Sequence, residues 1–262
     1  MPTQKAYTSP QQRRKRMLLV LVVIIILFAG RIVMMRTGVL RSIVELEPQE
    51  LKERIERSEV RVLCDNRAGT GTIVDVRKNS LKETDYTCTI VTAAHIILPE
   101  DTADTSAASD TGTESAAKIT VVLQEGDDPL DAVLAAADRE LDAAVIRCRL
   151  PESDFKTTHD ADLLEVLFSR DALARIAKDD KVYCVSPDGA LYSGVYVSGD
   201  ITVEGIGDHR MAVLCENTEG MSGAGVYDVS GDYLGMITAG STDGVTACVP
   251  AADVMRLYND KK

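Results

Sequence analysis

Hydrophobic and polar residues follow one another in short stretches over most of the chain after residue 59, and turn-forming residues separate these stretches. The first group of β-like stretches comprises Val60–Cys64, Gly71–Val76, Tyr86–Thr92, Lys118–Gln124, Ala132–Ala137 and Leu141–Leu150. The second group comprises Lys181–Ser186, Leu191–Ser198, Ile201–Val203, Met211–Cys215, Tyr233–Thr238 and Val245–Val249. Many short strands with regular turns and few helices predict an all-β sandwich or barrel.

Three segments interrupt this β pattern. Residues 151–180 contain helix-forming runs and are predicted to connect two halves, at about 59–150 and 180–258. Residues 99–117 are acidic and small, which is typical of a surface insertion. The final stretch, Pro250–Tyr258, is predicted to be a C-terminal helix.

The N-terminal part has a different pattern. A basic, polar tail (residues 1–16) precedes an apolar stretch, residues 17–35, interrupted only by Arg31. A bilayer-spanning helix needs about 20 such residues, and an arginine near one end can extend to the interface. A cleaved signal peptide is the main competing interpretation, but no clear small-residue cleavage site follows. We predict a single transmembrane signal anchor, then a stalk (residues 36–58) containing a short exposed helix, with a cytoplasmic N-terminus and an extracytoplasmic body.

Charge and cysteine usage exclude several classes of protein. Of 29 basic residues, eight lie in residues 1–41 without any acid, so residues 42–262 hold 21 bases against 41 acids, a net charge of -20. Such an acidic body argues against nucleic acid as a partner, because binding there depends on neutralising phosphates. The six cysteines show no metal-ligand spacing. They are either packed in the core or paired as disulfides, and we predict no metal and no cofactor.

Three short motifs carry side chains suited to nucleophilic catalysis. They are Thr92-Ala-Ala-His95, Leu141-Asp142 and Gly220-Met-Ser222-Gly. A serine hydroxyl attacks only when a base takes its proton, and a histidine base must be held in one tautomer by a carboxylate. The chain order His95, Asp142, Ser222 is one known arrangement of such a triad. Asp138 is an alternative acid. The backbone N–H groups of Gly220 and Ser222 would stabilise the oxyanion of the tetrahedral intermediate.

These motifs together resemble the trypsin-like (chymotrypsin-fold) serine peptidases, and among them the HtrA type. The matching stretches are Gly69–Val74, Ile90–His95, Leu141–Ile146, Gly220–Gly225, Leu234–Ile237 and Val245–Pro250. The resemblance implies two six-stranded antiparallel β-barrels, with His95 and Asp142 on the first barrel and Ser222 on the second. It also implies that Thr238, Ala239 and Gly240 line the pocket for the substrate side chain before the cut bond.

The chain departs from the family pattern around the serine. Met221 stands where the family usually has Asp or Asn, and no PDZ-like domain is expected after the final strand. Glu216 aligns with the base of the specificity pocket, where an acid favours Arg or Lys in the substrate. His159 and His209 are interpreted as surface residues.

We therefore expect a membrane-anchored serine endopeptidase that cleaves extracytoplasmic polypeptides, with the lipid bilayer as a second partner through residues 17–35. The alternative from another class is a peptide-binding or sensor protein with a weak or silent triad, because fold does not guarantee activity. The sequence sets no oligomeric state.

Overall fold

The structure is a computed structural model that describes residues 45–78, 85–98, 118–124, 126–151, 172–203, 207–241 and 244–259. The described residues belong to one compact unit that begins at Glu45. No helix within these ranges is both long enough and apolar enough to cross a membrane. The predicted basic tail, the predicted anchor at residues 17–35 and the first part of the predicted stalk lie outside the described residues, as does His159.

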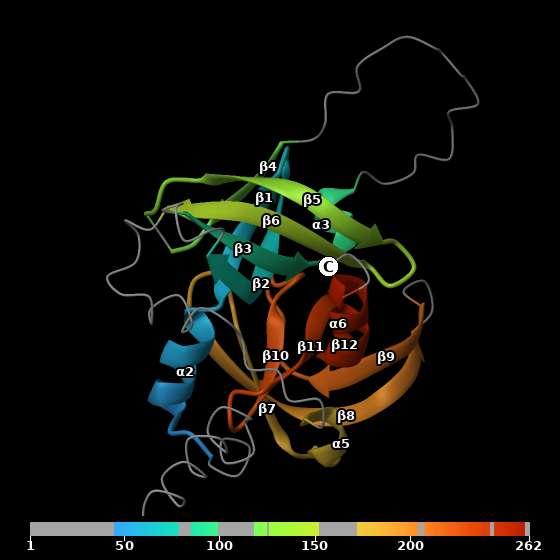
Figure 1. The fold of residues 1–262 in the computed structure, drawn as a ribbon. Helices are drawn as coiled ribbons and strands as arrows, with labels where there is room; N and C mark the ends of the chain where they lie inside the picture. Colours follow the sequence, from blue (N-terminus) through green and yellow to red (C-terminus); the bar gives the residue numbers. More distant parts are fainter. Residues whose placement is uncertain are drawn as a thin grey trace, which may run out of the picture. The chain divides into compact units, whose positions relative to one another are not determined.

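The first half of the body folds into a closed barrel of antiparallel strands (Figure 1). Its strands are β1 (Glu59–Cys64), β2 (Arg67–Lys78), β3 (Asp85–Thr92), β4 (Ile119–Val122), β5 (Leu130–Asp138) and β6 (Ala143–Pro151). They close in the order β1-β2-β3-β6-β5-β4. Inward-facing side chains such as Val62, Ile90 and Ile146 form the core of this barrel.

The second half repeats this architecture. Its strands are β7 (Lys181–Val185), β8 (Leu191–Val203), β9 (Gly207–Leu214), β10 (Gly225–Asp228), β11 (Tyr233–Gly240) and β12 (Val245–Pro250). They close in the order β10-β11-β12-β9-β8-β7, again antiparallel throughout. The expectation of two six-stranded antiparallel barrels is therefore confirmed.

Two glycines lie inside strand β2, which begins four residues before the predicted stretch Gly71–Val76. Gly69 and Gly71 pair with Val62 and Val60 of β1, and the turn falls at residues 65–66. The glycines are needed for close packing, since a Cβ on Gly71 would lie 2.6 Å from Cγ2 of Ile90. A glycine within a strand often marks such a close approach.

The long strand β8 joins two stretches that the sequence separates, and its register against β9 shifts at three places. His209 lies in β9, and its side chain is exposed as predicted. Its ring Nδ1 lies 3.0 Å from Oδ1 of Asp200 on the neighbouring strand.

An apolar cluster separate from the core of each barrel joins the two barrels and their helices. Helix α2 (Pro48–Glu56) buries Leu51 and Ile55, each 1% exposed, in this cluster. The expectation of an exposed helix in a stalk is therefore wrong for this face of α2, because two of its apolar side chains, four residues apart, pack against the barrels.

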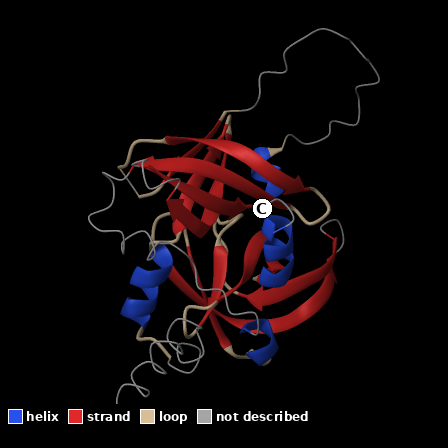
Figure 2. Cartoon of the chain, in the orientation of Figure 1, coloured by secondary structure: helices blue, strands red, loops and turns tan. Residues whose placement is uncertain are grey.

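The other helices are short or terminal, and the described chain is mostly strand (Figure 2). Helix α3 (Ala94–Ile97) follows β3, and α5 (Ala172–Arg175) is the described part of the predicted connection. Helix α6 (Ala251–Asn259) is the predicted C-terminal helix and contacts strands of both barrels (Figure 1).

Candidate active site

His95 and Asp142 meet because the end of β3 pairs with the start of β6. Thr92 is the register partner of Ala144, so the residues just after β3 and just before β6 share one rim of the first barrel. The Nδ1 atom of His95 lies 2.8 Å from Oδ2 of Asp142, and the backbone N–H of His95 donates to Oδ1 at 2.9 Å. One carboxylate thus holds both the ring and the backbone of the histidine.

This contact sets the histidine tautomer. An ionised carboxylate only accepts hydrogen bonds, so Nδ1 of His95 carries the proton and Nε2 is left with a lone pair in the neutral ring. The side chain of His95 is 46% exposed, whereas that of Asp142 is 19% exposed. The histidine ring is therefore open to solvent, whereas the carboxylate that orients it is largely shielded.

The turn before β6 fixes the position of Asp142. Asp142 adopts a left-handed backbone with φ of +53°, and its N–H donates to the carbonyl of Arg139 at 3.2 Å. The alternative acid, Asp138, accepts the N–H of Leu141 at 2.9 Å and so stabilises this turn. Of the two acids, only Asp142 contacts His95 through a hydrogen bond given by the described structure.

A buried arginine of the second barrel supports the same turn. Arg210 lies on β9 and is 1% exposed. Its Nη1 donates to the carbonyl of Leu141 at 2.8 Å, and its Nη2 donates to the carbonyl of Glu140 at 2.7 Å. The Asp142 turn of the first barrel is therefore held from the second barrel, by a residue that the sequence motifs do not point to.

The Ser222 loop connects β9 to β10 and docks on Thr70 of the first barrel. The Thr70 hydroxyl donates to the carbonyl of Gly220, and its backbone N–H donates to the carbonyl of Ser222, both at 2.8 Å. Both Gly220 and Gly223 have φ of +89°, a conformation that glycine adopts without steric cost. The loop thus turns twice around the serine while its carbonyls face the first barrel.

Two close approaches place this loop beside the histidine helix. A Cβ on Gly223 would lie 1.9 Å from the carbonyl oxygen of Thr70, so no larger residue fits there without movement. A Cβ on Gly69 would lie 2.1 Å from Cδ1 of Ile96 and 2.9 Å from the carbonyl oxygen of Ser222. Ile96 directly follows His95, so the serine and histidine segments meet over Gly69.

The comparisons with known proteins agree with this architecture. The family model for a trypsin-like peptidase domain matches residues 69–236. The chain belongs to the trypsin-like peptidase family. No curated protein matches significantly.

Solved structures show the same fold at low sequence identity. An inactive form of Rv3671c from M. tuberculosis H37Rv, a serine-to-alanine mutant, superposes with a TM-score of 0.55 at 15% identity, covering 83% of this chain and 95% of that one. Another structure described as the inactive form of the Rv3671c protease gives the same score and identity, covering 83% of this chain and 98% of that one. The HtrA-type protease AlgW, solved with a tripeptide, has a TM-score of 0.61 at 16% identity, covering 82% of this chain and 63% of that one.

Met221, the main departure of this peptidase from the family pattern, packs in the core of the second barrel. Its side chain is fully buried, and its sulfur lies 3.2 Å from the backbone nitrogen of Thr218, which donates to it. A methionine suits an irregular apolar space because its side chain is flexible and polarisable. The substitution therefore changes the interior of the loop and not the surface beside Ser222.

The four residues expected in the specificity pocket lie around the end of β11. Thr238 is buried and donates to the carbonyl of Ala247 at 3.2 Å, Ala239 is half-buried, and Gly240 is exposed. A Cβ on Gly240 would lie 2.2 Å from Nδ2 of Asn217, so the Asn217 side chain lies against this glycine. Glu216, which precedes Asn217, is exposed.

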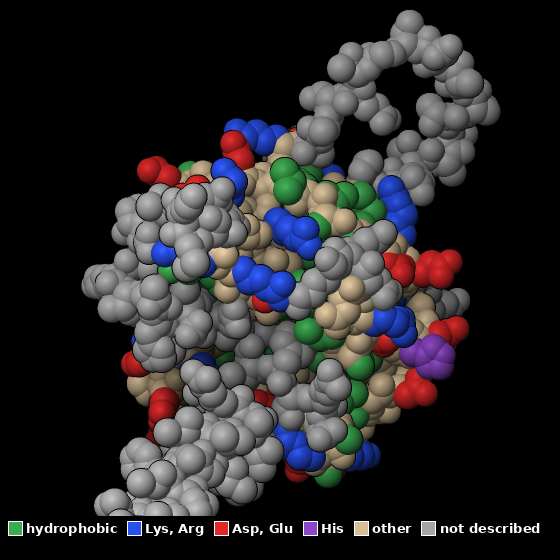
Figure 3. All heavy atoms as spheres, in the orientation of Figure 1, with side chains coloured by type: hydrophobic (Ala, Val, Ile, Leu, Met, Phe, Trp, Pro, Cys, Tyr) green, Lys and Arg blue, Asp and Glu red, His purple; other side chains and the backbone are tan. Residues whose placement is uncertain are grey.

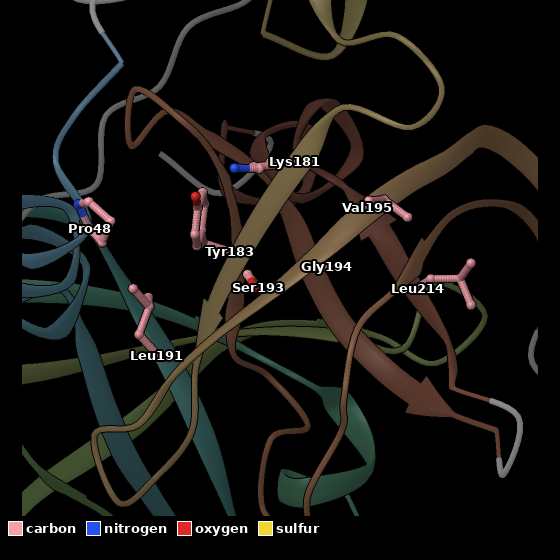
Figure 4. Close-up of a pocket in the computed structure, with 8 residues that line it drawn as sticks. All are labelled: Pro48, Lys181, Tyr183, Leu191, Ser193, Gly194, Val195 and Leu214. Carbon is pink, nitrogen blue, oxygen red and sulfur yellow. The ribbon is translucent and has the colours of Figure 1, made fainter.

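A hollow of about 470 Å³ lies elsewhere on the peptidase (Figure 4). It is lined by Pro48, Lys181, Tyr183, Leu191, Ser193, Gly194, Val195 and Leu214. These residues come from α2, β7, β8 and β9, and none belongs to the three candidate catalytic motifs.

The face in Figure 3 carries basic and acidic side chains together. Within the described ranges, no group of three or more His, Cys, Asp or Glu residues is placed to hold a metal ion.

Proposed function

We propose that this peptidase is a serine endopeptidase in which Ser222 is the nucleophile, His95 the general base and Asp142 the carboxylate that orients the base. The observation that carries the proposal is the double hydrogen bond between Asp142 and His95, next to a serine loop that docks over Gly69. These are the groups that acyl transfer needs.

The proposed reaction proceeds in two halves. Oγ of Ser222 attacks the carbonyl carbon of the peptide as its proton passes to Nε2 of His95, and the carbonyl oxygen becomes an oxyanion. The intermediate collapses when His95 gives this proton to the leaving amine, which leaves an ester on Ser222. Water, deprotonated by His95, then attacks the ester, and the proton returns to Ser222 as the carboxylic acid departs.

The oxyanion would be stabilised by the backbone N–H groups of Gly220 and Ser222. Among the described residues, neither group donates a hydrogen bond, whereas the carbonyls of the same two residues are bound by Thr70. Backbone donors that are held in place but unused suit this role, and the loss of one such donor costs about 3 to 4 kcal/mol in the transition state.

Substrate selection is proposed to involve Glu216 together with Thr238, Ala239 and Gly240. Asn217 lies against Gly240, so the backbone of Glu216, the residue before it, passes near the proposed pocket wall. An exposed acid there would favour Arg or Lys before the cleaved bond. A cleavage profile on a peptide library, compared between the wild type and Glu216→Gln, tests this preference.

We further propose that the peptidase is anchored in the cell membrane through residues 17–35, with its N-terminus in the cytoplasm and its body outside. The support is the apolar stretch and the basic tail before it. In cells, the protein should resist extraction by alkaline carbonate, and its body should be digested by protease added from outside. Release by carbonate would contradict the anchor.

A second candidate function is peptide binding by a silent triad. One observation favours it, because within the described structure no hydrogen bond joins Ser222 to His95. Such bonds are often long in structures without substrate and tighten in the complex. The alternative predicts peptide retention without turnover, unchanged by replacement of Ser222.

The two candidates are separated by a fluorophosphonate probe, which reacts only with an activated serine. The full-length protein should be labelled at Ser222, and Ser222→Ala should abolish labelling. A folded wild-type protein that remains unlabelled would remove the enzymatic proposal and leave the binding protein.

A further inference from the structure

A buried carboxyl of the first barrel contacts the strand that follows the proposed nucleophile. Glu59 opens β1 and is 8% exposed. Its Oε1 accepts the backbone N–H of Gly225 at 3.0 Å, the hydroxyl of Thr72 at 3.2 Å and the hydroxyl of Tyr227. Gly225 and Tyr227 belong to β10 of the second barrel, so a single oxygen atom of Glu59 joins the two barrels.

This contact is close to the Ser222 loop in both sequence and space. Gly225 lies three residues after Ser222, and the Thr72 hydroxyl is also 3.5 Å from the carbonyl oxygen of Gly223. The Tyr227 ring folds back over Gly225, since a Cβ there would lie 2.5 Å from the tyrosine oxygen. Glu59 therefore anchors the point where the loop becomes strand β10.

The second oxygen of the same carboxyl is buried and has no hydrogen-bond partner among the described residues. A buried polar atom without a partner is rare in folded proteins and calls for an explanation. Because Oε1 already accepts from three donors, a proton taken up by Glu59 goes to Oε2. The three hydrogen bonds then persist with a neutral acceptor.

No positive charge among the described elements balances Glu59. The titratable groups that face it are Tyr227 from β10, Tyr233 from β11 and Cys184 from β7. Burial raises the pKa of Glu59 to about 7, although the hydrogen bonds from Tyr227, Gly225 and Thr72 act in the opposite direction. The carboxyl therefore changes its charge in the range where a histidine base also titrates.

We propose that Glu59 is a positioning residue for the Ser222 loop, and that loss of its negative charge in mildly acidic solution loosens the loop and lowers the reactivity of Ser222. The inference rests on the proposed function of Ser222. Its physical basis is that hydrogen bonds to an ionised acceptor are roughly twice as strong as those to a neutral one.

The reactivity test compares the wild type with Glu59→Gln, an isosteric neutral residue that keeps an oxygen for the three donors. At about pH 8.5 the fluorophosphonate should label wild-type Ser222 about tenfold faster, and the ratio should approach one at about pH 5.5, where both acceptors are neutral. The same histidine base acts in both proteins, so its contribution cancels in the ratio. A ratio that is the same at every pH would overturn the proposal.

A matched control is Asp232→Asn, which removes a buried carboxylate that belongs to the second barrel. Asp232 is 2% exposed and pairs with Arg175 at 2.8 Å, and none of its hydrogen bonds within the described ranges reaches the Ser222 loop. This variant should lose stability but keep the wild-type labelling rate and its pH dependence. If it reproduced the Glu59→Gln ratio, Glu59 would have only a structural role.

A second readout does not depend on activity. Protein carrying 15N-glycine and 13C-carbonyl alanine selects glycines that follow alanine, which in this chain are Gly30, Gly69, Gly225 and Gly240. The amide shift of Gly225 should follow a titration near pH 7 in the full-length wild type and stay flat in Glu59→Gln. A flat wild-type Gly225 signal overturns the proposal even where labelling is normal. If the fluorophosphonate does not react with Ser222 but the Gly225 signal titrates, the enzymatic proposal and the stated effect on reactivity are removed. The contact between Glu59 and Gly225 is then kept.

Discussion

The two loops that carry the candidate catalytic groups are each held by a charged residue of the opposite barrel. Arg210 of the second barrel donates to carbonyls of the Asp142 turn, and Glu59 of the first barrel accepts from Gly225 just after the Ser222 loop. The two supports differ in chemistry, because arginine stays charged at all accessible pH values, whereas Glu59 titrates near neutrality. The position of the Asp142 turn should therefore not depend on pH, whereas the position of the Ser222 loop should.

The comparison also separates stability from function. The fold as a whole favours neutral Glu59, because burial of the charged form is unfavourable. The Ser222 loop, in the proposal above, is held best by the ionised form. A residue that costs stability where it serves activity is a known compromise at functional sites.

The largest expected effect is that of Asp142→Asn. It sets the upper limit for the loss of activity caused by any substitution that only displaces Asp142. The amide can donate to Nδ1 and so favour the wrong histidine tautomer, and we expect turnover to fall by about 10⁴-fold. Steady-state cleavage of a peptide substrate measures this. A near-normal rate would show that Asp142 does not orient the base.

Arg210→Met should act as a weaker version of the same change. The turn at Glu140 and Leu141 loses two donors, so Asp142 is less well placed, and we expect a fall in kcat/KM of about a hundredfold. The fall should be the same at every pH, in contrast to Glu59→Gln. A loss that varies with pH would contradict the difference drawn between the two supports.

Glu59→Gln should change the pH dependence of stability. The pKa of Glu59 is about 7 in the fold against 4.5 ordinarily, so between these values the folded state binds the extra proton and the wild type loses stability as pH rises. The loss totals about 3 kcal/mol across this window and should be absent in the variant. Chemical denaturation at several pH values measures it, and parallel curves for the two proteins would refute it.

The smallest expected effect is that of Met221→Leu. The side chain is buried in the core of the second barrel, and a swap of similar volume costs less than about 1.5 kcal/mol. Labelling of Ser222 should stay within a few-fold of wild type at all pH values. A loss as large as that of Arg210→Met would place Met221 in the positioning of the loop.

The strand pattern predicted an all-β sandwich or barrel, and the resemblance carried by the three motifs implied both barrels and the meeting of His95 with Asp142. Alternation along a strand is a local signal, and the structure keeps it in both barrels. His95 and Asp142 flank two strands that pair, so their meeting follows once β3 and β6 are neighbours. The burial of Leu51 and Ile55 was not predicted, because a short amphipathic helix looks alike whether it packs or stands free.

Glu59 and Arg210 could not be found from the sequence for a related reason. Each directly precedes a stretch predicted as an apolar strand, and a charge near a strand end is normally solvated. What distinguishes the two is burial by the opposite barrel, which is a property of the fold. The start of β2 at Arg67 was missed because a stretch with two glycines, Gly69 and Gly71, signals close packing and turns equally well.

The central claim is that Ser222 attacks as a nucleophile activated by His95, and burst kinetics with an activated ester test it most directly. Full-length protein mixed with a p-nitrophenyl ester should release about one equivalent of nitrophenol per chain before steady turnover, and mass spectrometry should find the acyl group on Ser222. Ser222→Ala should show neither. A folded wild-type protein with no burst, or an acyl group on another residue, would contradict the account.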